Sequence, residues 1–305
     1  MLVYPRNPAL CDVSSPPDPL YHFGFAYDNR QKYKELFGDV KFICTGGSGT
    51  RMKHIAQVLR KELPEYLPVP VEQQSGAGMQ SEQEVKNLCL TDRYEMYKVG
   101  PVLCVNHGIG MPSLSVMFTE LFKLLYYSGC EDVCLFRCGT CGGLGVEPGT
   151  VVITDKAYNG LLETKYEQFI LGKRHQSDSR LDPYLAKSLL AVGKRMTFPV
   201  VLANTISTDG FYEEQARQNS FNYDLSETDV KSFLTRAHQD YGVVNIEMEA
   251  VCIGSLCRLA GVKAAVVCAT ILDRLIDDIP KEHDNFDQRP TQLVAEYIKW
   301  TLKTK

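Results

Sequence analysis

The sequence lacks the features that mark several classes of protein. It has no run of about 20 apolar residues, which a membrane-spanning helix requires. Its proline-rich start, up to Pro19, has no apolar core like that of a secretory signal. The net charge is only −4 over 305 residues, so no overall field attracts nucleic acid or an acidic membrane surface. We therefore expect neither a membrane nor a nucleic acid as partner, and any anion site must be local.

Metal-binding patterns are also missing. Cys138 and Cys141 have C-x-x-C spacing, but a zinc site needs a second well-spaced ligand pair, and the six histidines supply none. We therefore expect no metal and favour a structural interpretation of this pair over a redox one. The 11 cysteines are odd in number, which fits free thiols in a reducing, cytoplasmic protein better than disulfides. Several lie in apolar runs and are expected in the core: Cys44, Cys104, Cys134 and Cys268.

Strand and helix patterns alternate along most of the chain. Apolar runs that predict strands occupy residues 40–44, 102–105, 133–136, 151–154, 200–203, 243–245 and 262–270. Helical patterns begin near 52 and cover 112–127, 226–240, 249–260 and 293–302. This alternation predicts an α/β sheet covered by helices on both faces. Residues 1–25 are proline-rich and irregular and are expected to form an N-terminal arm, with one domain over 26–305.

Three predicted strand ends carry residues suited to an anion. They are Gly46 to Arg51, Arg137 to Gly143, and Thr270 to Arg274. Glycine lets backbone N–H groups approach an anion, and arginine offers paired donors that match phosphate. The first segment is neither a Walker loop nor a dinucleotide loop, because it lacks a Gly-Lys ending and Met52 stands where a third glycine would fall. Together the three ends suggest a phosphate held from several sides.

Two further segments could contact a ligand. Glu247 and Glu249 follow a predicted strand and precede an apolar helix, where a carboxylate can accept hydrogen bonds from a diol. In the segment from Phe211 to Arg217, Gln215 and Arg217 could recognise the edge of a heterocycle, because amide and guanidinium groups offer complementary donors and acceptors. Either segment alone could also be solvent-facing polar surface.

In combination these motifs resemble a known family, the animal-type uridine phosphorylases of the nucleoside phosphorylase-I family. The similarity runs from Tyr21 to the terminal helix, and its most specific stretches are Gly38–Phe42, Gly46–Lys53, Thr91–Tyr94, Tyr97–Leu103, Lys123–Tyr127, Glu147–Thr154 and Asn245–Glu249. The resemblance implies a single domain with a central mixed β-sheet flanked by helices. It also implies reversible phosphorolysis of uridine to uracil and ribose 1-phosphate, as in pyrimidine salvage, without a cofactor.

The resemblance also implies roles for individual residues. It implies phosphate binding by Gly47, Arg51, Arg137 and Thr140. It implies a homodimer in which Arg93 reaches the neighbouring subunit's phosphate and His22 reaches the ribose 5′-hydroxyl. The ribose contacts would be Met248, Glu249 and Thr140. The base contacts would be Phe211, Gln215, Arg217, Ile271, Leu272 and Arg274, the last three on a segment that closes over the base. Gln215, Arg217, Arg51 and Arg137 would be the catalytic groups.

Departures from the family pattern leave alternatives open. Cys141 stands where the family usually has serine, and Glu214, Ala216 and residues 218–220 replace a more glycine-rich loop. The alternatives are a related phosphorylase with broader pyrimidine deoxynucleoside specificity, a purine-specific member, a hydrolase, and a non-catalytic nucleoside-binding homologue. A redox protein that uses Cys138 and Cys141 is a further alternative.

Overall fold

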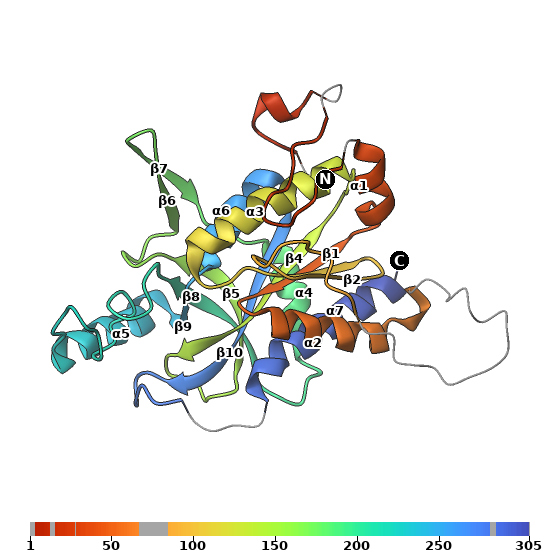
Figure 1. The fold of residues 1–305 in the computed structure, drawn as a ribbon. Coiled ribbons are helices and arrows are strands. Elements are labelled where there is room, and N and C mark those ends of the chain that lie inside the picture. The colour runs from red at the N-terminus through yellow and green to blue at the C-terminus, as the bar shows by residue number, and fades with distance from the viewer. Residues whose placement is uncertain (1–3, 13–15, 28, 67–84, 281–284, 305) are drawn as a thin grey trace.

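A computed structural model describes residues 4–12, 16–27, 29–66, 85–280 and 285–304. Its helices and strands alternate along the chain (Figure 1). The helices are η1 (Pro8–Leu10), α1 (Arg30–Phe37), α2 (Gly49–Glu62), η2 (Pro64–Tyr66), α3 (Gly110–Tyr127), α4 (Pro183–Gly193), α5 (Glu227–Tyr241), α6 (Ala250–Ala260), η4 (Phe286–Gln288) and α7 (Arg289–Lys303). The strands are β1 (Phe42–Gly46), β2 (Met96–Val99), β3 (Val102–Asn106), β4 (Cys134–Gly143), β5 (Val151–Tyr158), β6 (Lys165–Ile170), β7 (Lys173–Asp178), β8 (Val200–Ser207), β9 (Val243–Glu247) and β10 (Lys263–Asp273).

The central sheet is mixed, as predicted, and one side of it closes on itself. Its strand order is β10-β5-β8-β9-β4-β1-β3-β2, and β10 also pairs with β4. Strands β4, β9, β8, β5 and β10 therefore form a ring, while β1, β3 and β2 extend from β4. Because β1 runs parallel to both β3 and β4, the carboxyl ends of these three strands lie at the same edge. That edge is where an α/β sheet binds its ligands.

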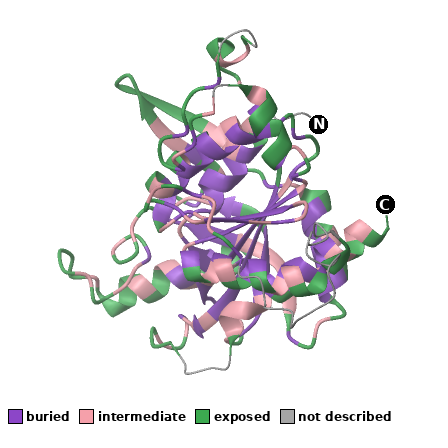
Figure 2. Cartoon of the chain, turned by 45° about the vertical axis from the view of Figure 1, so that its right-hand side comes forward, coloured by how far each residue is buried: buried purple, intermediate pink, exposed green. Residues whose placement is uncertain are grey.

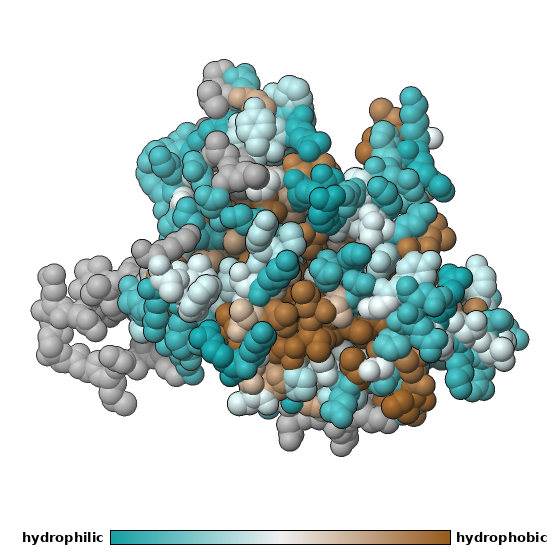
Figure 3. Space-filling model, turned by 180° about the vertical axis from the view of Figure 1, so that it is seen from behind, coloured by the Kyte–Doolittle hydropathy of each residue, from teal (hydrophilic) through white to brown (hydrophobic). Residues whose placement is uncertain are grey.

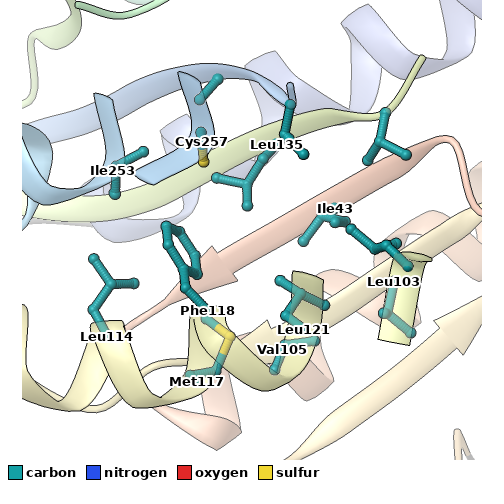
Figure 4. Close-up of a cluster of buried hydrophobic side chains, with 14 of the residues drawn as sticks. Ile43, Leu103, Val105, Leu114, Met117, Phe118, Leu121, Leu135, Ile253 and Cys257 are labelled. Carbon is teal, nitrogen blue, oxygen red and sulfur yellow. The ribbon is translucent and has the colours of Figure 1, made fainter. Parts of the chain in front are cut away.

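Helices cover both faces of the sheet because strand side chains alternate. Ile43, Leu103 and Leu135 face one way and pack with α3 and α6. Their neighbours Phe42, Val102 and Phe136 face the other way, into a second cluster with α2, α4 and α7. Figure 4 shows the first cluster, with side chains of α3 and α6 meeting those of the strands. Figure 2 shows the same arrangement as buried residues concentrated at the sheet and on the inner sides of the helices.

Helix boundaries follow the expected signals. The Ser226 side chain accepts a hydrogen bond from the Asp229 backbone N–H at 3.1 Å and caps α5. Gly261 ends α6 with φ of +74°, a conformation that favours glycine. Helix α3 begins at Gly110 and ends at Tyr127, so Pro112 lies in its first turn, as predicted. Helix α4, strand β2 and the β6–β7 hairpin were not predicted.

The β6–β7 hairpin projects from the molecule and carries exposed apolar side chains at its tip (Figures 1 and 3). Its strands are mostly polar and exposed, so they lack the apolar alternation that marks a core strand. The side chains of Phe169 and Leu171 are 74% and 95% exposed. This polarity explains why the sequence pattern did not reveal the hairpin.

The expectation of an irregular, unpacked arm over residues 1–25 needs correction at its end. Leu20 and Phe23 are fully buried, and Phe25 is nearly so, in the core cluster that contains α1 and α3. Leu20 and Phe25 also form an antiparallel bridge. Proline and glycine in this stretch indicate turns, but they do not prevent its aromatic side chains from packing. The domain boundary at residue 25 stays a prediction.

The positions of the cysteines agree with a structural role rather than a redox role. Cys44, Cys104 and Cys268 are buried as predicted, whereas Cys134 is only partly buried. Cys138 and Cys141 lie three residues apart in β4, so they face opposite sides of the sheet and belong to different core clusters. They cannot form a disulfide in this strand, which contradicts the redox alternative. In the described part of the chain no helix is long and apolar enough to cross a membrane.

A substitution in α3 tests the core. Phe118 is fully buried between the sheet and α6, so Phe118→Ala removes a ring from packed surroundings and should lower the free energy of unfolding by about 3–5 kcal/mol. Val116→Ala on the same helix, where the side chain is 36% exposed, is the control and should change it by less than about 0.5 kcal/mol. Denaturant titration measures both, and equal effects would contradict the assignment of this helix face to the core.

Candidate active site

Two glycine-bearing loops meet at the carboxyl edge of the sheet. Strand β1 ends at Gly46, which pairs with Asn106 at the end of β3. A Cβ atom at Gly47 would lie 3.2 Å from the carbonyl oxygen of Gly108, so the two loops pack backbone against backbone. Helix α2 starts immediately after, capped by the Ser48 hydroxyl, which accepts from the Arg51 backbone N–H at 3.2 Å. The edge therefore presents a helix N-terminus, which favours a bound anion.

Arg137 is the central residue of this edge. It lies in β4 opposite Thr45 of β1 and is only 6% exposed. Its guanidinium group pairs with Glu249, lies 3.4 Å from a Glu247 oxygen through Nε, and contacts the Cys268 sulfur at 2.8 Å. Burial alone would lower the pKa of Arg137, but its acidic neighbours raise it well above the ordinary value. The group is therefore a permanent buried cation.

Glycine makes room for this guanidinium group. A Cβ atom at Gly139, two residues along the same strand face, would lie 2.2 Å from Nη1 of Arg137. Such a contact is far inside van der Waals distance, so any other residue at this position would force the arginine to move. Gly139 in β4 thus provides the space that the Arg137 side chain needs. Thr140, also in β4, is partly exposed next to it.

The carboxylates of Glu247, the last residue of β9, and Glu249, which precedes α6, have different roles. Glu247 accepts hydrogen bonds from the backbone N–H groups of Glu249 and Ala250, at 3.0 and 2.9 Å, and so holds the start of α6. Burial raises the pKa of Glu247. Glu249 accepts from the Gly110 backbone N–H at 2.8 Å and pairs with Arg137. Burial opposes its ionisation, but Arg137 and His107 hold the pKa of Glu249 below its ordinary value, so it is an anion.

His107 is a residue of this site that sequence analysis missed. It follows β3, its backbone N–H donates to the Gly46 carbonyl at 2.9 Å, and its side chain is fully buried. Within the described residues, neither ring nitrogen has a hydrogen-bond partner. Burial and the neighbouring Arg137 lower its pKa to about 4, so the ring is neutral. The sequence signal that could have revealed it is its position immediately before the glycine turn at Gly108, at the end of a predicted buried strand.

The remaining contacts expected for the ribose also converge here. Met248 lies between the two glutamates, and its terminal methyl group is 3.9 Å from the position of a Cβ atom at Gly110. This places Met248 beside the same glycine turn that Glu249 holds. The structure therefore brings together Gly47, Arg51, Arg137, Met248 and Glu249, with Thr140 in the adjoining strand.

The expected base contacts form a second group on the loop after β8. The guanidinium group of Arg217 lies 4.2 Å above the centre of the Phe211 ring. Its Nη1 donates to both oxygens of Asp278 at 2.7 Å, and its Nε donates to the Phe211 carbonyl at 3.1 Å. Gln215 is buried. Asp278 was absent from the predicted site, because nothing in the sequence shows that a residue 61 positions away pairs with Arg217.

Arg274 ties this loop to the sheet. It donates through Nη2 to the Ala216 carbonyl at 3.0 Å, through Nη1 to the Gln215 carbonyl, and through Nε to Asp278 at 3.0 Å. Burial lowers the pKa of Arg274. A Cβ atom at Gly142 would lie 2.8 Å from its Cδ atom, so β4 leaves space for it. Arg274 therefore acts here as a structural clamp on the loop.

Two expectations for this second group need adjustment. Ile271 and Leu272 were expected on a closing segment, but they lie inside β10, and Leu272 is 1% exposed. The pairing of β10 with β4 is irregular at this point, which breaks the regular alternation. Ala216, where the family pattern is richer in glycine, has φ of +54°. A non-glycine residue in this region is strained.

His22 and Arg93 lie on the surface, away from this machinery. Both are exposed, and neither side chain forms a hydrogen bond or ion pair with Arg51, Arg137 or Glu249 in the described part of the chain. The Thr91 hydroxyl donates to the His22 carbonyl, so the segment that carries Arg93 is attached to His22. The structure thus brings these two residues into one surface region but does not bring them into this chain's own site.

A cavity of about 340 Å³ opens beside the end of β8. None of the predicted site residues lines it; its walls include Met111, Ser207, Thr208, Asp209 and Glu214. The Thr208 backbone N–H donates to the Glu247 carbonyl at 3.0 Å, which places the cavity next to the carboxylate pair. Burial, followed by the charge of Glu214, raises the pKa of Asp209.

Comparison with known proteins agrees with this geometry. A model of the phosphorylase superfamily matches residues 41–299. Uridine phosphorylase 1 of Mus musculus is 42% identical over 93% of this chain and 89% of its own length. The uridine and thymidine phosphorylase of Caenorhabditis elegans is 40% identical over 94% and 92%. A crystal structure from work on uridine phosphorylases of the oomycete Phytophthora capsici has a TM-score of 0.86 at 36% identity and covers 99% of both chains.

A further relative shows that similarity alone does not establish activity. The inactive uridine phosphorylase B of Schistosoma mansoni is 38% identical over 92% of each chain. Active and inactive members of the family therefore share a comparable degree of similarity with this chain. Whether this chain is an active or an inactive member therefore has to be judged from the side chains of the site.

Stability against pH tests the buried imidazole. Above pH 6.5, His107 is neutral in both the folded and the unfolded chain. Between pH 6.5 and about pH 4, His107 is protonated in the unfolded chain but stays neutral in the folded chain. The free energy of unfolding should therefore fall by about 3 kcal/mol from this residue as the pH drops from 6.5 to 4. Urea titrations of the protein and of His107→Gln over this range measure the difference. Parallel pH profiles would show that the ring is not buried as a neutral group.

Proposed function

The chain belongs to the phosphorylase superfamily, and we propose that it is a uridine phosphorylase, which splits uridine with inorganic phosphate into uracil and ribose 1-phosphate. The observation that carries the proposal is the buried Arg137–Glu249 pair at the meeting point of the glycine loops. It provides a fixed cation for phosphate and a fixed anion for the ribose hydroxyls, side by side. Phosphorolysis of a nucleoside requires phosphate and ribose to be held next to each other, so that phosphate can attack C1′.

Phosphate would be held by Gly47, Arg51, Arg137 and Thr140. Three features support this assignment: the glycine backbone at Gly47, the N-terminus of α2 and the cation of Arg137. Arg51 has a buried Nε atom with no hydrogen-bond partner in the described residues, which is a donor in need of an acceptor. An arginine offers planar paired donors that match phosphate geometry.

Ribose would lie between phosphate and the carboxylate of Glu249, beside Met248 and Thr140. Glu249 is held in place from two sides, by Gly110 and Arg137, so its remaining lone pairs have a fixed direction. Such a carboxylate can accept hydrogen bonds from the 2′- and 3′-hydroxyls. Preorganisation of this kind lowers the entropic cost of aligning the sugar with the attacking phosphate.

Uracil would be recognised by Gln215 and Arg217 and would pack on Phe211, with Ile271, Leu272 and Arg274 nearby. Arg217 uses Nε and Nη1 for the Phe211 carbonyl and Asp278, so Nη2 is the donor that is left for the base. As the bond from C1′ to uracil breaks, negative charge develops on the base. Fixed donors that face this charge stabilise the transition state as an oxyanion hole does.

The proposed reaction uses phosphate as co-substrate and no other cofactor. Phosphate attacks C1′ while the sugar carries oxocarbenium character, and the phosphate anion itself stabilises that positive charge. The arginines hold phosphate in line with the departing base. The free thiols in the structure are compatible with the reducing cytoplasm that we propose as its location.

The active unit in this proposal is a homodimer. Arg93 and His22 would complete the phosphate and ribose sites of the neighbouring subunit. Both are exposed in one surface region, and the nearby side chains of Tyr21 and Leu90 are 74% and 77% exposed. Exposed apolar side chains that lie together are typical of a surface that another chain covers.

Two alternatives have specific support. A relative named for both uridine and thymidine favours broader specificity for pyrimidine nucleosides. The inactive relative favours a non-catalytic homologue. Against the second, Arg51, Arg137, Gln215 and Glu249 are all present in this chain. An assay with uridine, thymidine, 2′-deoxyuridine and inosine, with and without phosphate, separates these alternatives and also detects a hydrolase, which needs no phosphate.

Two substitutions test the proposed base contacts. Gln215→Leu and Arg217→Leu each remove a donor that faces the leaving base, so each should lower the turnover of uridine by about 10²–10³-fold. The loss of uridine absorbance measures the rate. Gln218→Leu, an exposed position in the same loop, is the matched control and should retain turnover close to that of the unmodified protein. Near-normal turnover in either of the first two variants would refute the assignment.

A further inference from the structure

A buried carboxylate outside the site fixes one of the surface residues assigned to the partner's site. Glu120 lies in α3 and is 7% exposed. Its two oxygens accept from the His22 backbone N–H at 2.9 and 3.0 Å and from the Phe23 backbone N–H at 3.0 Å. One of them also lies 2.7 Å from Nδ1 of the His22 ring. A single carboxylate thus holds both the backbone and the ring of His22.

This arrangement sets which ring nitrogen carries a proton. A carboxylate can only accept, so Nδ1 must donate to Glu120. In a neutral imidazole the other nitrogen, Nε2, then has a lone pair. Nε2 has no hydrogen-bond partner within the described residues, and the His22 side chain is 45% exposed. His22 therefore presents an acceptor outward from the surface.

The surroundings make this presentation rigid. Phe23, the next residue, is fully buried and packs edge-on against Tyr94 with ring centres 6.0 Å apart. The Thr91 hydroxyl donates to the His22 carbonyl, and the Tyr94 hydroxyl donates to the Ser113 carbonyl of α3 at 2.9 Å. An exposed histidine ring that serves no ligand does not need to be fixed by a buried carboxylate. The fixed orientation of the ring would serve a ligand that binds to Nε2.

We propose that Glu120 is a positioning residue that holds His22 in the tautomer with Nδ1 protonated, so that Nε2 accepts a hydrogen bond from the 5′-hydroxyl of the nucleoside bound in the neighbouring subunit. This inference rests on the proposed function and on the proposed shared dimer. Glu120 touches no substrate; it acts through His22. Its effect should therefore depend on the 5′-hydroxyl and on the presence of the His22 ring.

The first experiment compares uridine with 5′-deoxyuridine. In Glu120→Gln the amide N–H₂ can donate to Nδ1, which moves the ring proton to Nε2 and turns the acceptor into a donor. We expect kcat/KM for uridine to fall about tenfold, the worth of about one hydrogen bond, with no change for 5′-deoxyuridine. Glu131→Gln, the same substitution at an exposed position beyond the end of α3, is the control and should change neither value.

A second background keeps the test valid if Glu120→Gln alters folding. In a His22→Ala protein the ring is gone, so adding Glu120→Gln should cause no further loss of kcat/KM for uridine. An additional loss there, or an equal loss for both substrates in the first experiment, would show that Glu120 only supports the fold and would overturn the inference. Thermal unfolding of each variant reports whether the fold is retained.

A mixed dimer tests whether His22 acts across the interface. Subunits with Glu120→Gln and subunits with Arg217→Leu, carrying different affinity tags, are purified as a mixed dimer. If His22 is donated to the partner, one site has an intact Arg217 and an intact Glu120–His22 pair, so the dimer should show about half of the unmodified activity, a value set by one working site of two. Action within one chain predicts about one twentieth instead.

The unmodified protein separates failure of this inference from failure of the proposed function. If it does not phosphorolyse uridine, the proposed function is wrong. If it does so but turns over 5′-deoxyuridine equally well, His22 does not bind the 5′-hydroxyl; the whole inference is then overturned, while the proposed function stands.

Discussion

The buried pairing of Arg137 with Glu249 is the interaction on which the rest of the site depends. A charge removed from water is costly unless it is paired and hydrogen-bonded. Here the cation has two carboxylate neighbours, and Glu249 has a second donor in the Gly110 backbone. Removal of Arg137 would leave both carboxylates buried without a cation, and removal of Glu249 would leave Arg137 with only the more distant Glu247. The pair therefore fixes the carboxyl ends of β4 and β9 relative to the turn before α3.

Several glycines follow from this constraint. Gly139 leaves the space that the Arg137 guanidinium group occupies, and Gly47 lets the loop after β1 approach the loop after β3. Both loops start from strands that run parallel and in register, so the sheet itself brings them to one edge. A phosphate at this edge would meet a helix N-terminus and a fixed arginine without movement of the backbone. Strand register, rather than loop sequence, thus determines this half of the site.

The predictability of each part follows from its physical origin. The strands and helices of the core could be predicted because side chains such as Ile43 and Phe42 alternate between two apolar layers. The β6–β7 hairpin lacks that alternation and was missed. The glycine–arginine segments were recognised because their chemistry is local in the sequence, but the segment from Arg137 to Gly143, predicted to follow a strand, lies inside β4. Asp278 and Glu120 were not recognised, because each works through a partner that only the fold brings near.

The two halves of the site differ in how strongly they are held. The half proposed for phosphate and ribose lies on strands and buried charges. The half proposed for the base depends on Asp278, whose side chain is 36% exposed, to link Arg217 with Arg274. Because the carboxylate of Asp278 is partly exposed, water and salt weaken these ion pairs, although both arginine side chains are largely buried. Ala216, with its positive φ, adds strain in the same loop. If this loop binds the base as proposed, substitutions in it should alter base recognition and loop stability together, because the buried charges of the Arg137 edge do not depend on the loop.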